Sequence, residues 1–192
     1  MRISSYIYIV CAALVMSLAQ ACSEPRNFEL DIHAMDSLHT VMDHTLLSLD
    51  SCSLNISDSV TRQLTYIQSN YGGEIKQTMA RSLLRYGEFR DKASTLINWK
   101  DSLRLRKDRL ENEIYAFRSA LADRATHDAT QREITELYAD SIAKSLVSKQ
   151  QQWHAKVNEW MQIQQETFYQ WQLANDTILQ WCDSIPQRKQ LQ

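Results

Sequence analysis

Three side chains near the N-terminus have the types and the spacing of metal ligands. Asp36, His39 and Asp43 lie at i, i+3 and i+7, so they share one face of any helix that contains them. Carboxylate oxygens and imidazole nitrogens are ligands that zinc and similar cations accept, and His33 and His44 flank the group. Because no second segment supplies an evident fourth ligand, the pattern favours a solvated polar helix face over a metal centre, and we expect no cofactor.

Sequence signatures of catalysis are missing. The chain has three glycines, at positions 72, 73 and 87, which is too few and too scattered for a loop that cradles phosphates. It also has no dinucleotide-binding motif and no nucleophile-elbow sequence. Since the sequence defines the surroundings of no acid, base or nucleophile, it predicts a protein that is not an enzyme.

Charge is unevenly distributed along a chain that carries 21 basic and 23 acidic residues. Residues 27–73 contain six acids and Arg62 as the only strong base. The chain as a whole is close to neutral, and this overall balance argues against non-specific nucleic-acid binding. We expect the acidic helices to pack beside the basic stretch, and we prefer that interpretation to an anionic-ligand patch. The basic stretch also supplies the candidate partner-binding residues, namely Lys100, Arg104, Arg106, Lys107 and Arg109.

The first 21 residues have the pattern of a secretory signal peptide. Arg2 supplies the positive start, residues 7–18 form an apolar run, and small residues follow. The segment Leu18-Ala19-Gln20-Ala21-Cys22 resembles the lipobox of bacterial lipoproteins. The resemblance covers only this N-terminal segment and implies that Cys22 carries a lipid, that residues 22–27 link the anchor to the fold, and that the membrane is a partner.

Two other fates of this segment stay open. Ala19-Gln20-Ala21 also suits an ordinary signal peptidase, and residues 3–19 are slightly short for an uncleaved spanning helix of about 20 residues. If the chain follows the usual lipoprotein sorting pattern, Ser23 after the cysteine points to the outer membrane of the bacterial envelope, without indicating which of its faces.

A long helical region dominates the mature chain. Residues 88–185 contain neither glycine nor proline, and apolar residues repeat there every seven positions, as in a coiled coil. The tryptophans follow similar spacing, which favours core packing over ligand stacking. The repeating residues are Phe89, Leu96, Leu103, Leu110 and Phe117, and the spaced tryptophans are Trp153, Trp160, Trp171 and Trp181.

The apolar repeat fails between residues 122 and 134, where we expect a turn near 124–130, although a continuous helix stays open. Thr130 and Glu133 have the spacing of a capping box. We expect an all-α fold with helices over about 28–50, 58–71, 74–123 and 131–184, in a single domain spanning 28–185, followed by a loose tail at 186–192. The two long helices would form an antiparallel hairpin in which Leu103 faces Trp153 and Phe117 faces Leu137.

The apolar surface is wider toward the open end of this hairpin. We therefore expect the two shorter N-terminal helices to pack there as a small helical bundle beside the anchor, leaving a two-helix arm near the turn. Cys52 and Cys182 would then lie too far apart for a disulfide. Beyond the lipid anchor, these features favour a non-enzymatic adaptor, scaffold or spacer that binds a protein partner. A small-ligand or metal carrier using the bundle base is the alternative, and the oligomeric state stays open.

Overall fold

The computed structural model describes residues 28–52, 55–71 and 73–184, and the protein is all-α over these ranges. The helices are α2 (Glu29–Ser51), α3 (Ile56–Asn70), α4 (Gln77–Ala122) and α5 (Glu136–Ser184). Within these ranges, the only β-type pairing is an isolated antiparallel bridge between His127 and Glu133. The expected signal peptide, Cys22, the linker and the tail lie outside the described residues.

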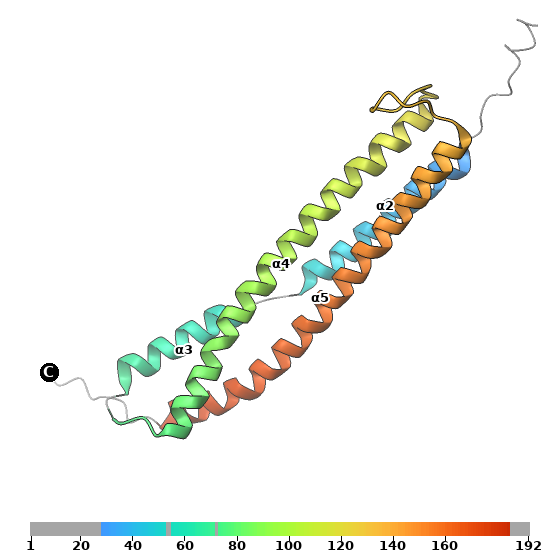
Figure 1. The fold of residues 1–192 in the computed structure, drawn as a ribbon. Coiled ribbons are helices and arrows are strands. Elements are labelled where there is room, and N and C mark those ends of the chain that lie inside the picture. Colours follow the sequence, from blue (N-terminus) through green and yellow to red (C-terminus); the bar gives the residue numbers. More distant parts are fainter. Residues whose placement is uncertain (1–27, 53–54, 72, 185–192) are drawn as a thin grey trace, which may run out of the picture.

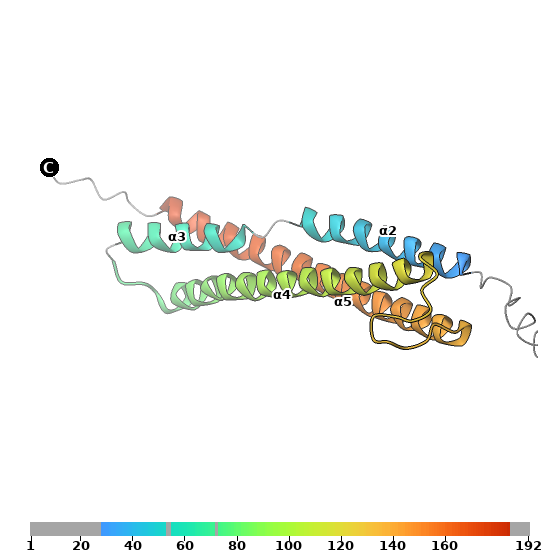
Figure 2. The ribbon, with the colours of Figure 1, turned by 90° about the horizontal axis from the view of Figure 1, so that it is seen from above.

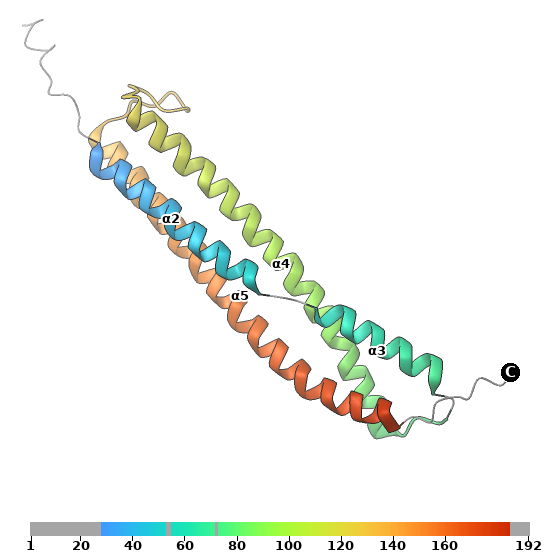
Figure 3. The same cartoon turned by 180° about the vertical axis from the view of Figure 1, so that it is seen from behind.

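Helices α4 and α5 lie side by side and run in opposite directions, and the shorter helices α2 and α3 follow one another along them (Figures 1 and 2). Helix α2 contacts both α4 and α5, whereas α3 contacts chiefly α4 (Figure 3). The result is an elongated bundle with three helices in nearly every cross-section. We call the part that contains α2 the loop half, because it ends at loop 123–135, and the part that contains α3 the open half.

The predicted position of the first short helix is wrong. Helix α2 packs in the loop half, where Asp36 near its start pairs with Arg118 near the end of α4. The apolar surface is widest at the open end, which favoured packing of both short helices there, whereas the charged surface near the turn gave no such indication. In the structure α2 covers that surface with apolar residues and carboxylates together. The expected two-helix arm and four-helix base are therefore absent from the described residues, and only α3 packs at the open end.

Each half has its own apolar core. The loop-half core joins the buried side of α2 to the end of α4 and the start of α5, whereas the open-half core joins α3 to the start of α4 and the end of α5. The largest fully buried side chains of the loop half include Met35, Met42, Leu49, Leu103 and Trp160. Those of the open half include Ile56, Val60, Tyr86 and Ile178.

Two buried tryptophans fix the register of α4 against α5. The indole N–H of Trp153 donates to the Leu103 carbonyl oxygen at 2.9 Å, and that of Trp160 donates to the Leu96 carbonyl oxygen at 2.8 Å. The predicted proximity of Leu103 to Trp153 is therefore confirmed. Leu137 was expected to face Phe117, but its side chain is 84% exposed, because α5 begins only one residue before it and the preceding loop sets its direction.

The chain turns between α4 and α5 through loop 123–135, which Asp128 organises. Its carboxylate accepts hydrogen bonds from the backbone N–H groups of Thr130 and Arg132 and from the Tyr138 hydroxyl. The Tyr138 hydroxyl and these amides hold the pKa of Asp128 well below its usual range. The predicted Thr130–Glu133 capping box is wrong, because α5 begins only at Glu136 and both residues lie in the loop. Thr135 caps α5 instead, by accepting from the Tyr138 amide at 3.2 Å.

Candidate functional site

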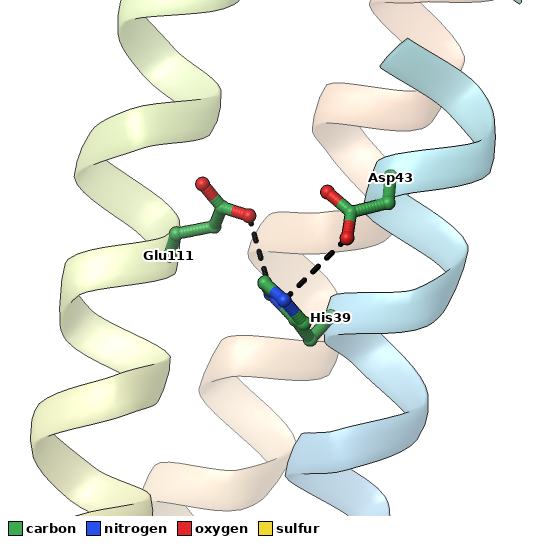
Figure 4. Close-up of side chains that lie close together, drawn as sticks. All are labelled: His39, Asp43 and Glu111. Atoms are coloured by element: carbon green, nitrogen blue, oxygen red, sulfur yellow. Dashed lines mark ion pairs between the residues drawn. The ribbon is translucent and has the colours of Figure 1, made fainter. Parts of the chain in front are cut away.

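The densest group of metal-ligand types in the described residues lies between α2 and α4 (Figure 4). His39 stands between two carboxylates: its Nε2 lies 3.4 Å from Asp43 Oδ2, and its Nδ1 lies 3.2 Å from Glu111 Oε1. One ligand atom from each residue lies within 4.8 Å of the others. The two carboxylates contact different ring nitrogens, and a single metal ion can bind only one of these.

Lys107 already supplies a cation to this group. Its ammonium lies 3.0 Å from Asp43 Oδ1 and 2.6 Å from Glu111 Oε1, and the residue is only 6% exposed. Desolvation opposes the charged ammonium, but its hydrogen bonds to Glu111 and Asp43 outweigh that effect and raise the pKa of Lys107. The same hydrogen bond from Lys107 lowers the pKa of Asp43. The cluster therefore works as an ion-pair network that ties α2 to α4.

The ligand set expected from the sequence is only partly assembled. Asp36 lies outside the group, because its carboxylate accepts from the Arg118 guanidinium at 2.5 Å, and this hydrogen bond lowers the pKa of Asp36. Glu111 joins the group from another helix. Sequence reasoning missed Glu111, because its contact with His39 depends on how far α2 is displaced along α4, which local spacing does not encode.

The basic stretch divides into two sets that face different sides of α4. Lys100, Arg104 and Lys107 face α2. Arg104 Nη2 lies 2.6 Å from Asp50 Oδ1, while Lys100 Nζ lies 3.8 Å from the same oxygen and donates to the Cys52 carbonyl at 3.2 Å. The prediction that acidic helices pack beside the basic stretch is thus confirmed for α2, and these three cations are committed to intramolecular contacts.

Arg106 and Arg109 face the opposite side, where α4 and α5 enclose a groove of about 440 Å³. We call it the basic groove. Leu110 and Trp153 form its floor and are only 5% and 4% exposed, and basic side chains from both helices lie along it. Its lining residues are Arg106, Arg109, Leu110, Glu113, Lys149, Gln152, Trp153, Ala155 and Lys156.

The open half contains a buried polar group without formal charge. The Tyr86 hydroxyl is fully buried and contacts the side-chain oxygens of Gln63 on α3 and Asn175 on α5, the latter at 2.6 Å. Burial raises the pKa of Tyr86, against a smaller lowering effect of the neighbouring Trp171. One hydroxyl therefore links all three helices of this half, which the sequence pattern did not indicate.

The remaining candidate residues have structural positions. His154 Nδ1 lies 3.0 Å from the Thr45 hydroxyl in the contact between α2 and α5. His127 lies in loop 123–135, with its Nδ1 3.0 Å from the Thr126 hydroxyl. Cys52, which follows α2, and Cys182, near the end of α5, are free thiols, and burial of Cys182 raises its pKa.

Part of the far end of α5 exposes apolar side chains that no described helix covers. Phe168, Tyr169, Leu173 and Leu179 are all exposed, and they lie on the final third of the helix. None of the described helices is long and apolar enough to cross a membrane. Comparison with known proteins identifies no relative, since no family model, curated protein or solved structure matches this chain.

Proposed function

We propose that this chain is a non-enzymatic, lipid-anchored protein of the bacterial envelope that acts as an adaptor or spacer by binding a protein partner. We also propose that α4 and α5 form a coiled-coil hairpin. Heptad positions of α4 that are buried against α5 or α2, including Leu96, Leu103, Leu110 and Phe117, support the hairpin.

The observation that carries this function is the arrangement of α2 and α3 one after the other along the α4–α5 pair. Helix α5 has 49 residues, so the bundle extends for roughly 70 Å at 1.5 Å per residue. A chain of this size that packs into one compact core would extend far less. Length gained in this way is useful for spanning a distance or for presenting a long lateral surface.

The position of α2 also orients the proposed anchor. Helix α2 begins in the loop half, where Phe28 is buried in the loop-half core, and Cys22 lies only six positions earlier in the sequence. A lipid on Cys22 would therefore hold the loop end close to the membrane and direct the open end away from it. This orientation is opposite to the sequence expectation, which put the open end beside the anchor.

The carrier alternative has weaker support. Its best candidate ligands, Asp43 and Glu111, are paired with the Lys107 ammonium, so a metal ion would have to displace a cation held at 2.6 and 3.0 Å. The open-half core, which was the other candidate region, is crossed by the Tyr86 hydrogen bonds.

Fluorescence quenching in vesicles tests this orientation. Single cysteines at Ala129 and at Gln180, in a background with Cys52 and Cys182 replaced by alanine, would carry a dye on lipidated protein in vesicles with nitroxide-labelled headgroups. We expect strong quenching at position 129 and little at position 180. The matched control is Cys22→Ser, which should show no quenching at either position. Equal quenching at both positions, or quenching that survives Cys22→Ser, would contradict the proposed anchoring.

A further inference from the structure

Helices α4 and α5 leave two grooves along their contact in the loop half, and the described residues fill one of them. Helix α2 occupies the groove next to Arg104 and Lys107. The basic groove lies on the other side, next to Arg106 and Arg109. Positions 104 and 107 share a helix face at 3.6 residues per turn, whereas 106 and 109 point elsewhere. The filled groove therefore shows how this helix pair accepts a third helix.

Helix α2 fills its groove with a repeat of two residue types. Met35, Met42 and Leu49 recur every seven residues and are fully buried. An aspartate follows each of them directly, and these aspartates pair with basic residues of α4. The pairs are Asp36 with Arg118, Asp43 with Lys107, and Asp50 with Arg104. An apolar stripe flanked by carboxylates is thus the chemistry that this helix pair recognises.

The basic groove offers matching chemistry. Four cations line it, and the single carboxylate among its lining residues, Glu113, pairs with Lys149 across the groove. Lys156 pairs with Glu159 on its own helix. Arg106 and Arg109 are exposed and have no ion-pair partner among the described residues. Their guanidinium groups, one helical turn apart, are suited to bind carboxylates.

We infer that the basic groove docks an acidic amphipathic helix of a partner protein, which packs against Leu110 and Trp153 and pairs with Arg106 and Arg109. This inference rests on the proposed adaptor function and specifies its partner surface. Charge complementarity favours the acidic helix, because α2 shows the same complementarity on the other side of α4.

A helix fits this groove better than an anionic membrane surface does. The groove lies between two helices that run side by side in opposite directions, and its lining comes from residues 106–113 of α4 and 149–156 of α5. Residues 106–113 lie 9 to 16 positions before the end of α4, which puts the groove roughly 15–25 Å from the loop end and on the side of the bundle.

Titration of the unlipidated chain with designed peptides tests this inference. The probe is a synthetic helix that repeats the apolar–aspartate heptad of α2, and the control peptide carries lysine in place of each aspartate. Amide and indole signals followed by NMR would locate binding. We expect shifts at Leu110, Glu113, Lys149 and the Trp153 indole N–H with the acidic peptide, and none with the lysine peptide.

Charge reversal provides the matched variants. Arg106→Glu with Arg109→Glu should weaken binding by about tenfold or more, because rim charges of the wrong sign repel the probe. Arg81→Glu with Arg85→Glu makes the same charge change on exposed α4 residues of the open half and should leave affinity within about twofold. Unchanged helicity would show that both variants are folded.

Three results would overturn the inference. Shifts confined to α2 would mean that the peptide displaces α2 from its own groove. Equal losses in the two variants would mean that only net charge matters. Arginine-dependent binding to phosphatidylglycerol vesicles, with no binding to the peptide, would assign the groove to a membrane surface. None of these results bears on the anchor experiment, so the groove and the anchoring can fail separately.

Discussion

The two halves of the bundle attach a short helix to the same pair of long helices in different ways. In the loop half, α2 combines a buried apolar stripe with ion pairs from Asp36, Asp43 and Asp50 to α4. In the open half, α3 packs through apolar residues and the Tyr86–Gln63 hydrogen bond, and the described residues contain no ion pair between α3 and a neighbouring helix.

The comparison indicates that different interactions determine how strongly a short helix is held and at which register it packs. Apolar burial contributes most of the stability in both halves, but an apolar stripe can slide by a turn at modest cost. Ion pairs at three points seven residues apart favour the register of α2 in which all three form. The partly exposed pairs are individually weak, so their main effect is on the register rather than on the total free energy of unfolding.

Cavity formation should separate the halves most strongly. Met42→Ala removes a fully buried side chain from the loop-half core, and Ile67→Ala removes a buried one from the open-half core. Each should cost about 2–5 kcal/mol of unfolding free energy. Hydrogen exchange should show the lost protection mainly in α2 for the first variant and mainly in α3 for the second. Uniform loss across all four helices would mean that the two cores form one cooperative unit.

Removal of the buried hydroxyl should affect the open half next. Tyr86→Phe removes the hydroxyl that contacts the side-chain oxygens of Gln63 and Asn175, which should cost about 1–3 kcal/mol. Chemical denaturation measures the total, and exchange of α3 amides shows its location. Tyr115→Phe is the matched control, since Tyr115 is exposed and should tolerate the change. A neutral Tyr86→Phe would show that the open half relies on apolar packing alone.

The loop half should respond to loss of its buried ammonium. Lys107→Met keeps the aliphatic length but leaves Asp43 and Glu111 facing each other without a cation. We expect a loss of about 1 kcal/mol, which is smaller than for a fully buried charge because Asp43 is half exposed. Lys144→Met, which breaks only an exposed pair with Asp140 within α5, should be nearly silent in denaturation. If the two variants behave alike, the network does not hold α2.

Lowering the pH should have the smallest effect, and this effect should fall mainly on the loop half. The folded-state pKa values of Asp36 and Asp43 are lowered by Arg118 and Lys107 respectively. Their contribution is therefore present above the unfolded pKa near 3.8 and is lost as pH falls through the lower folded values. Exchange protection of α2 should fall below about pH 4, before that of α3. Raised salt at neutral pH should shift the same amides in the same direction.

The fold was predictable where the pattern is local. Helix existence, the break before Ile134 and the contact of Leu103 with Trp153 follow from apolar periodicity and chain length. The position of α2 does not follow from apolar area alone. It also depends on Asp36, Asp43 and Asp50, which pair with basic residues of α4. The roles of Glu111 and Tyr86 were not predicted for a related reason, since each depends on contacts with residues that are distant in sequence.

The distance along the chain between α2 and its binding groove determines when that helix can dock. Thr45 contacts His154, so part of the groove that holds α2 is built from residues about 109 positions later in the chain. Helices α4 and α5, joined by a short loop, pair first, and α2 closes onto them last. Until both long helices are available, Met35, Met42 and Leu49 stay uncovered, so an incompletely folded chain offers them as a binding site for chaperones.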